Sequence, residues 1–352
     1  MNFEKSSALR APIKKGEDVR KFLSDLDLLR KDLRINRDKE YVYFPIKALS
    51  ENIESHGMII TKEFERHRKK PTSYQEIAAI PEALRQKLPS SYDMIGDIIL
   101  IKLSKDFQKY KNEIGESLLR ANKNIKTVAL IDRVRGEFRT RNVEIIAGEK
   151  ITKATHAEHR LKFKLDVKKT YFSPRLATER KRVAGLVQPS ETIVDMFAGV
   201  APFSIIIAKY ANPKIIYAID KNKDAVEYAK INVKNNNVLD KIEVIHGDAE
   251  KILTILDQKN VKADRIIMNL PFSAVIFFEY ALKVVADTCK IHYYDIIREE
   301  KIHERIEELK IIAKDRRISL TSLNVKKIKT YSPREFYMGI DITAKKNIAD
   351  VA

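Results

Sequence analysis

The chain has 352 residues, of which 44% are hydrophobic and 33% are charged. This length fits two or three domains with sizeable cores, so a globally disordered protein is excluded. The 67 Lys and Arg residues exceed the 49 Asp and Glu residues, and the resulting net charge of +18 predicts a polyanionic partner, either nucleic acid or an anionic membrane surface. A single cysteine, Cys289, excludes a disulfide framework and a multi-cysteine zinc site. We expect it to be a small buried residue.

The positive charge is unevenly distributed along the chain. Residues 1–75 hold 17 basic and 12 acidic residues, residues 76–180 hold 22 and 14, and residues 181–290 hold 15 and 13. The basic part is typical of a docking surface for a polyanion, and the near-neutral part is typical of a catalytic or cofactor-binding core. The alternative is that residues 76–180 merely carry a solvated lysine face.

No segment predicts a secretion signal or a membrane span. Residues 1–18 lack an apolar stretch, and apolar runs such as Ala274–Phe278 are far shorter than the ~20 residues that cross a bilayer. We therefore expect a cytoplasmic protein without membrane contact.

The first 166 residues predict two small α+β domains. In the first, over residues 1–70, apolar spacing predicts a helix over Asp18–Arg34 and a strand over Tyr41–Ile46. The basic, proline-containing segment His67–Ser73 suits a linker. The second, over residues 74–166, is expected to contain a helix at Asp106–Ala121 and strands at Ile95–Leu103, Thr127–Ile131, Val143–Ala147 and Leu161–Asp166.

From about residue 167 the pattern changes to alternating strands and helices, which predicts a doubly wound, mostly parallel sheet. Two consecutive strands at the end predict a terminal β-hairpin, an arrangement similar to that of class I (Rossmann-like) methyltransferases. We therefore expect an α/β domain of this class over residues 167–352, preceded by two small α+β RNA-binding domains. The expected strands are Thr192–Phe197, Lys214–Asp220, Lys241–His246, Arg265–Asn269, Lys290–Ile296, Thr321–Lys329 and Phe336–Thr343, and the helices are Pro202–Tyr210, Lys223–Asn235, Ala274–Ala286 and Glu299–Lys314.

Acidic residues lie at the ends of three successive predicted strands. Asp195 lies near the end of the first strand, Asp220 ends the second and Asp248 follows the third. The carboxyl ends of parallel strands form the ligand-binding edge of such a sheet. Each acid alone is more commonly a helix cap or a turn residue. Three at matching positions instead predict a binding site, with Asp220 able to accept the two hydroxyls of a ribose and Asp248 able to reach an adenine amino group.

The turn after the first strand contains small residues, Ala198–Gly199, that let the backbone approach a ligand. Its single glycine argues against a dinucleotide pyrophosphate. S-adenosylmethionine, which has no phosphate and two ribose hydroxyls, matches an acidic, glycine-poor site. The fourth strand ends in Asn269-Leu270-Pro271-Phe272, similar to the Asn-Pro-Pro-Tyr-like element of many nitrogen methyltransferases. The proline fixes the turn and the Asn amide can bind a base edge; the alternative is an ordinary strand-to-helix turn.

Six segments carry a family resemblance when they are taken together. They are GEFRTR (Gly136–Arg141), YFSPRLATER (Tyr171–Arg180), VDMFAGVAPFSI (Val194–Ile205), IMNLP (Ile267–Pro271), IHYY (Ile291–Tyr294) and YSPRE (Tyr331–Glu335). They resemble the archaeal and eukaryotic tRNA (guanine-37-N1)-methyltransferases over nearly all of residues 74–345. Residues 1–70 resemble the small N-terminal domain of that family less distinctively.

The resemblance implies an S-adenosylmethionine-dependent enzyme, most simply a monomer, that binds tRNA rather than DNA. The first domain would contact the tRNA elbow and the second the anticodon arm. Glu179 matches the general base, Arg139 the residue at the guanine carbonyl, and Tyr171 an aromatic residue that orders with bound tRNA. The implied cofactor-binding residues are Arg180, Asp195, Phe197, Ala198, Gly199, Phe203, Asp220, Lys221, Asp248, Ala249, Asn269 and Pro271.

The reaction independently requires these residue types. N1 of guanine carries a proton that a carboxylate must remove during methyl transfer, and an arginine can neutralise charge that develops on the guanine oxygen. Taken alone, Glu179 is more simply a surface residue paired with Arg180 or Arg182, and Arg139 a phosphate contact. Anticodon-loop bases stack on aromatic side chains. Among Tyr171, Phe172 and Phe272, we retain Tyr171 for this role.

Other functions stay open at this point. The same position of tRNA is the target of enzymes that methylate a carbon of a wyosine precursor, or that transfer an aminocarboxypropyl group. A non-enzymatic tRNA-binding protein is a further alternative, although it need not keep Asp195, Asp220 and Glu179. A membrane-surface protein is the weakest, since no basic amphipathic helix with a large apolar face stands out. No His and Asp cluster has the spacing of metal ligands, so we expect no bound metal.

Overall fold

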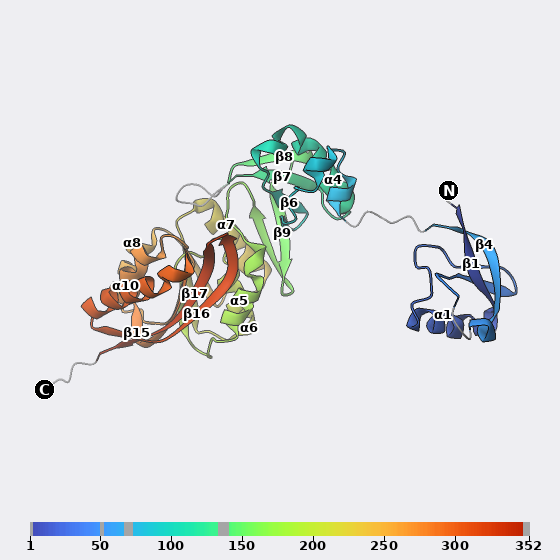
Figure 1. Ribbon diagram of the computed structural model, residues 1–352. Coiled ribbons are helices and arrows are strands. Elements are labelled where there is room, and N and C mark those ends of the chain that lie inside the picture. The colour runs from blue at the N-terminus through green and yellow to red at the C-terminus, as the bar shows by residue number, and fades with distance from the viewer. Residues whose placement is uncertain (1–2, 50–52, 67–72, 133–140, 348–352) are drawn as a thin grey trace. The chain divides into compact units, whose positions relative to one another are not determined.

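The computed structural model describes residues 3–49, 53–66, 73–132 and 141–347 (Figure 1). Contacts divide the chain into two compact units, Met1–Thr72 and Ser73–Ala352. Arg139 and nearly all of the predicted linker lie outside the described residues. The finer division of the second unit at residues 166 and 167 stays a prediction.

The first unit is a four-stranded antiparallel sheet, in the order β2-β3-β1-β4, with helix α1 packed on it through Val19 and Leu23. The expected helix over Asp18–Arg34 is too long, because α1 ends at Asp25. Asp27 adopts a left-handed φ of 52°, and the Leu28 N–H bonds the Leu23 carbonyl at 2.8 Å, which closes the helix end. The elements are β1 (Phe3–Pro12), α1 (Gly16–Asp25), β2 (Asn36–Arg37), β3 (Tyr41–Pro45) and β4 (Met58–Glu65), with 3₁₀ turns at Ile13–Lys15 and Ile53–His56.

The second unit begins with a four-stranded mixed sheet in the order β5-β6-β7-β8. The single strand expected over Ile95–Leu103 is instead a hairpin that turns at Gly96. Gly96 has a φ of 59°, and a Cβ there would lie 2.6 Å from the Thr155 carbonyl oxygen, so only glycine fits. The elements are α2 (Tyr74–Ile77), α3 (Glu82–Arg85), β5 (Asp93–Ile95), β6 (Ile98–Ile101), a 3₁₀ turn (Lys105–Tyr110), α4 (Lys111–Ala121), β7 (Thr127–Ile131) and β8 (Val143–Gly148).

A separate hairpin, β9 (Lys153–Glu158) and β10 (Leu161–Asp166), follows this sheet. Two asparagines attach it to helix α7 (Lys223–Asn235). The Asn232 side chain accepts from the Lys164 N–H at 2.7 Å and donates to the Lys164 carbonyl at 3.0 Å. Asn236 forms the same pair of bonds with Lys162, at 3.1 and 2.9 Å. The side chains thus pair with the backbone of β10 much as a neighbouring strand would.

A seven-stranded sheet in the order β13-β12-β11-β14-β15-β17-β16 forms the rest of the chain (Figure 1). Strands β11 to β15 are parallel, whereas β17 and β16 pair antiparallel at one edge as the expected terminal hairpin. This confirms the predicted fold class. The strands are β11 (Thr192–Asp195), β12 (Ile215–Asp220), β13 (Ile242–His246), β14 (Ala263–Met268), β15 (Val285–Ile297), β16 (Ile318–Ser332) and β17 (Glu335–Lys346).

Helices cover both faces of this sheet because successive strand residues point to opposite sides. Ile193 packs in one buried cluster with α6 and α7, and Val194 packs in another with α8 and α9. The sequence patterns missed α2, α3, α5, α8, β1, β2, β4 and β9. The helices are α5 (Ala177–Ala184), α6 (Pro202–Tyr210), α8 (Ala249–Gln258), α9 (Phe278–Lys283) and α10 (Ile302–Asp315), with 3₁₀ turns at Pro174–Leu176, Ala274–Phe277 and Glu299–Lys301.

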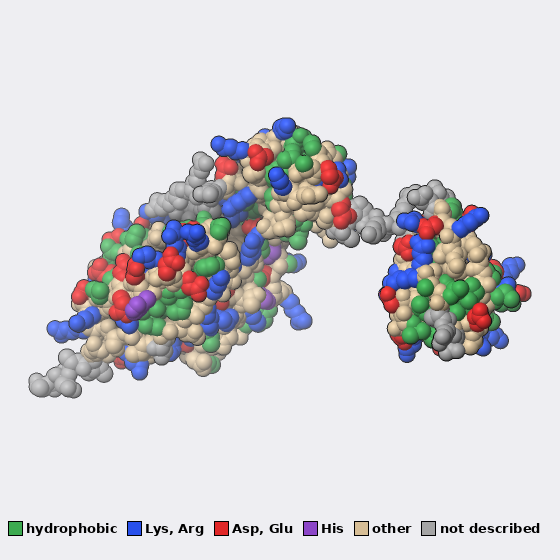
Figure 2. All heavy atoms as spheres, in the orientation of Figure 1, with side chains coloured by type: hydrophobic (Ala, Val, Ile, Leu, Met, Phe, Trp, Pro, Cys, Tyr) green, Lys and Arg blue, Asp and Glu red, His purple; other side chains and the backbone are tan. Residues whose placement is uncertain are grey.

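Charged side chains of both signs lie on the face of the molecule that Figure 2 shows. On the face that Figure 2 shows, Lys and Arg side chains alternate with Asp and Glu over both units. Among the residues that the structure describes, no helix is long and apolar enough to cross a membrane. Cys289 is buried, as expected, and burial raises its pKa well above the usual range of a thiol.

Candidate functional site

A pocket lies at the carboxyl ends of β11 to β14, where the sequence predicts ligand binding. Its empty space amounts to about 750 Å³ when the open solvent at its mouth is counted. Eight residues predicted for the site line it: Tyr171, Phe197, Gly199, Asp220, Lys221, Asp248, Ala249 and Asn269.

Asp220 is the central acidic group of the pocket. Its two carboxylate oxygens accept backbone N–H bonds from Gly199 at 2.6 Å and from Asn222 at 2.8 Å. Burial raises the pKa of Asp220, and these two bonds oppose that effect. Gly199 has a left-handed φ of 57°, which keeps its N–H directed at the carboxylate. The carboxylate is therefore fixed in place, and its remaining lone pairs can accept hydroxyl groups of a ligand.

Asp195 is buried beside the pocket, next to the lining residue Met196. One carboxylate oxygen accepts from the Ser204 hydroxyl at 2.7 Å, while Oδ1 has no hydrogen-bond partner among the described residues. Burial raises the pKa of Asp195 to about 7. The backbone N–H groups of Ser204 and Phe197 oppose this rise, and a buried carboxylate is unfavourable unless nearby groups compensate its charge.

Asp248 combines the ordinary role of a helix cap with a place on the pocket wall. Its side chain accepts from the Glu250 N–H at 3.0 Å at the start of α8, and it pairs with Lys221 at 2.8 Å. The bond from Lys221 lowers the pKa of Asp248, so it is an ionised acceptor. The cap and the binding function are therefore not exclusive alternatives.

The loop after β14 carries Asn269 to Phe272. The Asn269 side-chain oxygen accepts a hydrogen bond from the Tyr337 hydroxyl. Phe272 has a φ of 77°, a costly conformation for a bulky residue, and its N–H donates to the buried Asp295 carboxylate at 3.2 Å. Its ring is 50% exposed and contacts Tyr331 edge to face at 5.4 Å between centroids.

The two neighbouring aromatics 171 and 172 have different environments. Tyr171 lines the pocket, and the guanidinium of Arg141 lies 5.4 Å from its ring centroid. Phe172 is buried against Phe163 and the guanidinium of Arg180. Phe172 is therefore unavailable for stacking on a base, whereas Tyr171 remains a candidate.

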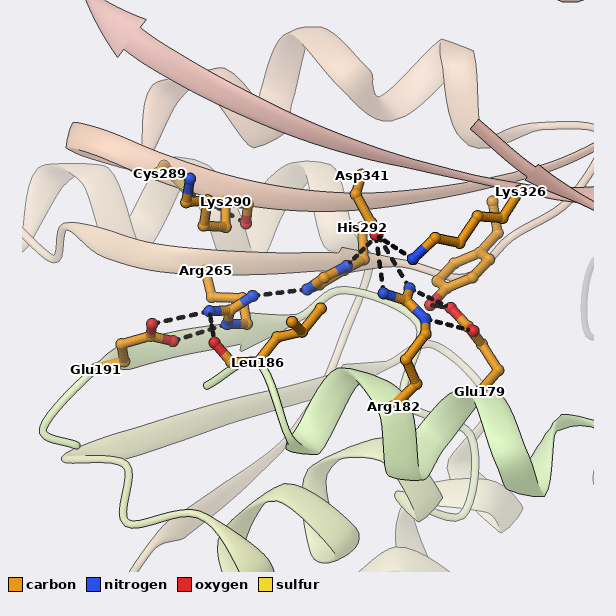
Figure 3. Close-up of polar contacts among 11 residues, drawn as sticks. Glu179, Arg182, Leu186, Glu191, Arg265, Cys289, Lys290, His292, Lys326 and Asp341 are labelled. Atoms are coloured by element: carbon orange, nitrogen blue, oxygen red, sulfur yellow. Dashed lines mark hydrogen bonds and ion pairs between the residues drawn. The ribbon is translucent and has the colours of Figure 1, made fainter. Parts of the chain in front are cut away.

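Glu179 lies on α5 and is only 8% exposed, so it is not the surface residue of the simpler alternative (Figure 3). Arg182 holds its carboxylate through two bonds of 2.8 and 2.6 Å, and the Tyr294 hydroxyl donates to it at 2.8 Å. The Tyr294 ring lies 6.0 Å from that of Tyr337, which bonds Asn269 at the pocket. Two tyrosines therefore connect Glu179 to the loop that borders the pocket.

Within the described part of the chain, five predicted cofactor residues do not line this pocket: Arg180, Asp195, Ala198, Phe203 and Pro271. Arg180 is buried and paired with Glu158 at 2.8 and 2.5 Å. Phe203 packs on the Tyr294 ring at 5.8 Å. These contacts give Arg180 and Phe203 positions in the interior behind the site residues.

The pocket also has lining residues that the sequence did not single out: Met196, Asn222, Ala225, Gly247, Leu270 and Phe277. Asn222 caps α7 by accepting from the N–H groups of Asp224 and Ala225, a role that its place before a predicted helix signals. No group of three or more His, Cys, Asp or Glu side chains is placed to hold a metal ion in the ranges that the structure describes. The absence of a metal stays a prediction.

Comparison with known families assigns three segments. Residues 154–321 match the TRM5/TYW2 methyltransferase domain, residues 75–152 the TYW2 N-terminal domain, and residues 8–54 the tRNA methyltransferase 5 N-terminal domain. Among curated relatives, the tRNA (guanine(37)-N(1))-methyltransferase Trm5b of Pyrococcus abyssi is 38% identical, over 95% of this chain and 98% of that protein. The tRNA(Phe) (4-demethylwyosine(37)-C(7)) aminocarboxypropyltransferase of Methanocaldococcus jannaschii is 35% identical, over 71% of this chain and 96% of that protein.

Solved structures show similar folds. A complex of a protein named aTrm5 with tRNALeu has a TM-score of 0.78 at 35% identity, and covers 97% of this chain and 99% of that chain. Trm5 of Methanocaldococcus jannaschii in complex with adenosine has a TM-score of 0.65 at 34% identity, and covers 97% of this chain and 100% of that chain.

Proposed function

The chain belongs to the TRM5/TYW2 methyltransferase family, and from this premise we propose that it transfers the methyl group of S-adenosylmethionine to N1 of guanosine 37 in tRNA. The observation that carries this proposal is a buried carboxylate, Glu179, connected through Tyr294 and Tyr337 to the loop of a ligand pocket. The similarity to Trm5b of Pyrococcus abyssi over 95% of the chain supports the choice of nucleoside.

The pocket residues fit the parts of S-adenosylmethionine. This cofactor supplies an electrophilic methyl group on a positively charged sulfur. Asp220, held by the Gly199 N–H, offers acceptors for the ribose hydroxyls, and the carboxylate of Asp195, buried beside the pocket, would favour a positively charged ligand when it is ionised. Asp248 is an ionised acceptor for the adenine amino group. Met196 and Phe277 supply apolar wall around these polar contacts.

The reaction at guanine requires a base and a way to neutralise the guanine oxygen. We assign the base to Glu179, whose carboxylate would take the N1 proton as the methyl group arrives. Arg139 would stabilise charge on the guanine oxygen; it lies outside the described residues. Asn269 would bind the base edge, and Tyr171 would stack on the base after it leaves the anticodon loop.

The chain binds tRNA, and we propose how its parts share that task. The unit over residues 1–72 would contact the tRNA elbow, and residues 74–166 the anticodon arm, as a monomer in which one chain supplies every site residue. The excess of basic over acidic residues before residue 181 supports this division, since phosphate contacts supply most of the affinity of such interfaces.

The relatives also include proteins named for the two alternative reactions, aminocarboxypropyl transfer and methylation of a wyosine precursor at position 37. The aminocarboxypropyltransferase covers only 71% of this chain, whereas residues 8–54 match the tRNA methyltransferase 5 N-terminal domain. This extra segment favours methylation of guanosine.

Nucleoside analysis by mass spectrometry tests the proposal. An unmodified tRNA transcript with guanosine 37 is incubated with the protein and S-adenosylmethionine, and a transcript with adenosine 37 is the control. We expect 1-methylguanosine from the first transcript only. An aminocarboxypropyl product, or transfer that requires a wyosine precursor, would establish the alternative. No product at all, with intact S-adenosylmethionine binding, would exclude the proposed reaction.

A further inference from the structure

A chain of buried polar contacts runs from Glu179 across four strands of the central sheet (Figure 3). Its members come from segments far apart in the sequence. Arg182 lies on α5, Arg265 on β14, His292 on β15 and Asp341 on β17. The pairing of the strands places His292 directly beside Asp341 and next to Ile267 of β14. Since polar groups in a protein interior are costly unless fully bonded, such a chain calls for an explanation.

Arg182 is the point at which two carboxylates meet. Its Nε and one terminal nitrogen donate to Glu179, and its two terminal nitrogens donate to Asp341 at 2.8 and 3.1 Å. The flat guanidinium therefore makes a forked contact with each acid. The single positive charge of Arg182 is therefore shared between the carboxylates of Glu179 and Asp341.

Asp341 has partners of its own on the other side. His292 Nδ1 lies 2.7 Å from one carboxylate oxygen, and Lys326 Nζ lies 3.5 Å from the other. Burial alone would raise the pKa of Asp341, but the bonds from His292 and Arg182 outweigh it and hold the pKa well below the usual range. Asp341 is therefore ionised throughout the pH range of a methyl-transfer assay.

His292 is a neutral link in the chain. Burial lowers its pKa, and its Nε2 lies 2.7 Å from an Arg265 nitrogen that can only donate. The Nδ1–H therefore donates to Asp341. Arg265 is neutralised by Glu191 through two bonds of 2.7 and 2.8 Å and donates also to the Leu186 carbonyl. At the end of this series of contacts that lies farthest from Glu179, the charge of Arg265 is thus neutralised and its side chain is held in place.

We propose that Arg182 and Asp341 are positioning residues that tune Glu179 as the proton acceptor, Asp341 by drawing part of the Arg182 charge away from Glu179. This inference rests on the proposed function, because it assigns to Glu179 the N1 proton of guanine. With Arg182 alone, the two hydrogen bonds to Glu179 would give that carboxylate the whole charge of the guanidinium. Asp341 binds the other side of the guanidinium. When Glu179 takes up a proton and loses its negative charge, Arg182 therefore still has an anionic partner.

The charged and titratable groups around Glu179 support this direction. On its own helix, Arg182 faces it; from β15 the Tyr294 hydroxyl donates to it; β17 contributes Asp341 through Arg182, and β16 contributes Lys326 to Asp341. Lys326 is 37% exposed, so solvent screens its charge. The neighbouring Arg180 is occupied by Glu158. Among the residues that the structure describes, Arg182 is therefore the main cation at Glu179, and Asp341 competes with Glu179 for it.

The test is the pH dependence of a single turnover of methyl transfer to tRNA, in the full-length protein. Loss of the cation in Arg182→Gln should make Glu179 easier to protonate, so the acidic limb of the pH–rate profile moves up by about one pH unit. Loss of the competing anion in Asp341→Asn should move the limb down by about one pH unit and lower the plateau rate about threefold. A purely structural role would lower the rate in both variants without moving the limb in opposite directions.

The double variant separates an effect through Arg182 from a direct one. In the Arg182→Gln background, Asp341→Asn should leave the limb where the single Arg182→Gln variant has it. Asp257→Asn, an exposed carboxylate paired with Lys262 at 2.9 Å, is the matched control and should keep the wild-type profile. Thermal unfolding of each variant identifies those that fail to fold; if either does, Arg182→Met or Asp341→Ser, which also remove the charge, takes its place and should shift the limb in the same direction.

Opposite shifts of the limb support the inference. Unshifted limbs, or shifts in one direction, in folded variants of a wild-type protein that makes 1-methylguanosine overturn it and leave the proposed function intact. A wild-type protein that makes no 1-methylguanosine overturns the proposed function instead.

Discussion

At the scale of single residues, Asp195 is a buried acid held in an unfavourable state beside the pocket. Its Oδ1 has no partner among the described residues, and burial raises its pKa to about 7. The folded protein therefore retains a proton between about pH 4 and 7 that the unfolded chain releases. The stabilisation that this gives is complete at low pH and is lost as the pH rises through 7. We infer that the ionised, buried Asp195 lowers the stability of the ligand-free protein and is kept because it favours ligand binding.

The change Asp195→Asn tests this reading. It removes the buried charge, so the ligand-free variant should have a higher melting temperature than the wild type at pH 8, and the difference should shrink towards pH 5. Its affinity for S-adenosylmethionine should fall, as calorimetry would measure. A variant that is less stable than the wild type at pH 8, or that binds the cofactor equally well, would show that the Asp195 charge does not serve the cofactor. Asp240→Asn is a control on the exposed surface.

Residue types alone indicated many of the pocket residues, but not which side chains contact the site residues. Asp220, Asp248 and Asn269 follow strands, so a pattern of strands and acids was enough to place them together. The contact of Arg182 with Asp341 joins residues 159 positions apart, and it depends on which strand pairs with β15. No local pattern carries that information.

At the scale of elements, the parallel strands and their helices were predictable because their apolar runs are continuous. Helix α8 was missed although Asp248 caps it, because the acid had been assigned to the ligand alone. Strand β9 was missed because its sequence, KATHAE, has little apolar character. The sequence likewise contained no sign that β10 is attached to α7. The attachment arises because two residues of a strand span ~6.6 Å and four residues of a helix span ~6.0 Å, so Asn232 and Asn236 match Lys164 and Lys162.

This attachment predicts a specific loss of stability. The Asn232 amide donates to the carbonyls of Lys164 and Val200. In Asn232→Asp a buried carboxylate would face both oxygens, and we expect a loss of about 3 kcal/mol or more in the free energy of unfolding at pH 7. Denaturant unfolding measures it. The same change at the exposed Asn235 of α7 should cost less than about 0.5 kcal/mol; equal effects at both sites would mean that the side-chain bonds contribute little.

At the scale of the whole molecule, the net charge of +18 is explained by the binding of tRNA, a polyanion. It is concentrated before residue 181, outside the near-neutral residues 181–290, which contain strands β11 to β14 of the seven-stranded sheet. The visible surface is nevertheless mixed in sign (Figure 2). From the excess of basic residues we expect a strong dependence of tRNA affinity on salt.

Exposed lysines of the first unit should contribute to that dependence. Replacing Lys14, Lys15, Lys21 and Lys31 with Gln should weaken tRNA binding. It should also reduce the slope of log affinity against log salt concentration by about 0.7–0.9 for each lost phosphate contact. Filter binding at several salt concentrations measures this, with Lys230→Gln and Lys234→Gln on α7 as the comparison. An unchanged slope would rule out a docking role for these lysines.

The most direct measurement is the single-turnover rate of methyl transfer to guanosine 37 by Glu179→Gln. This change keeps the size of the side chain and its bond from Tyr294 but removes the proton acceptor. We expect the rate to fall by about 10²–10⁴-fold, while the dissociation constants of tRNA and S-adenosylmethionine stay within a few-fold of the wild type. The exposed Glu304→Gln variant should react at the wild-type rate. A Glu179→Gln protein that methylates guanosine within a few-fold of the wild-type rate would show that another group takes the proton.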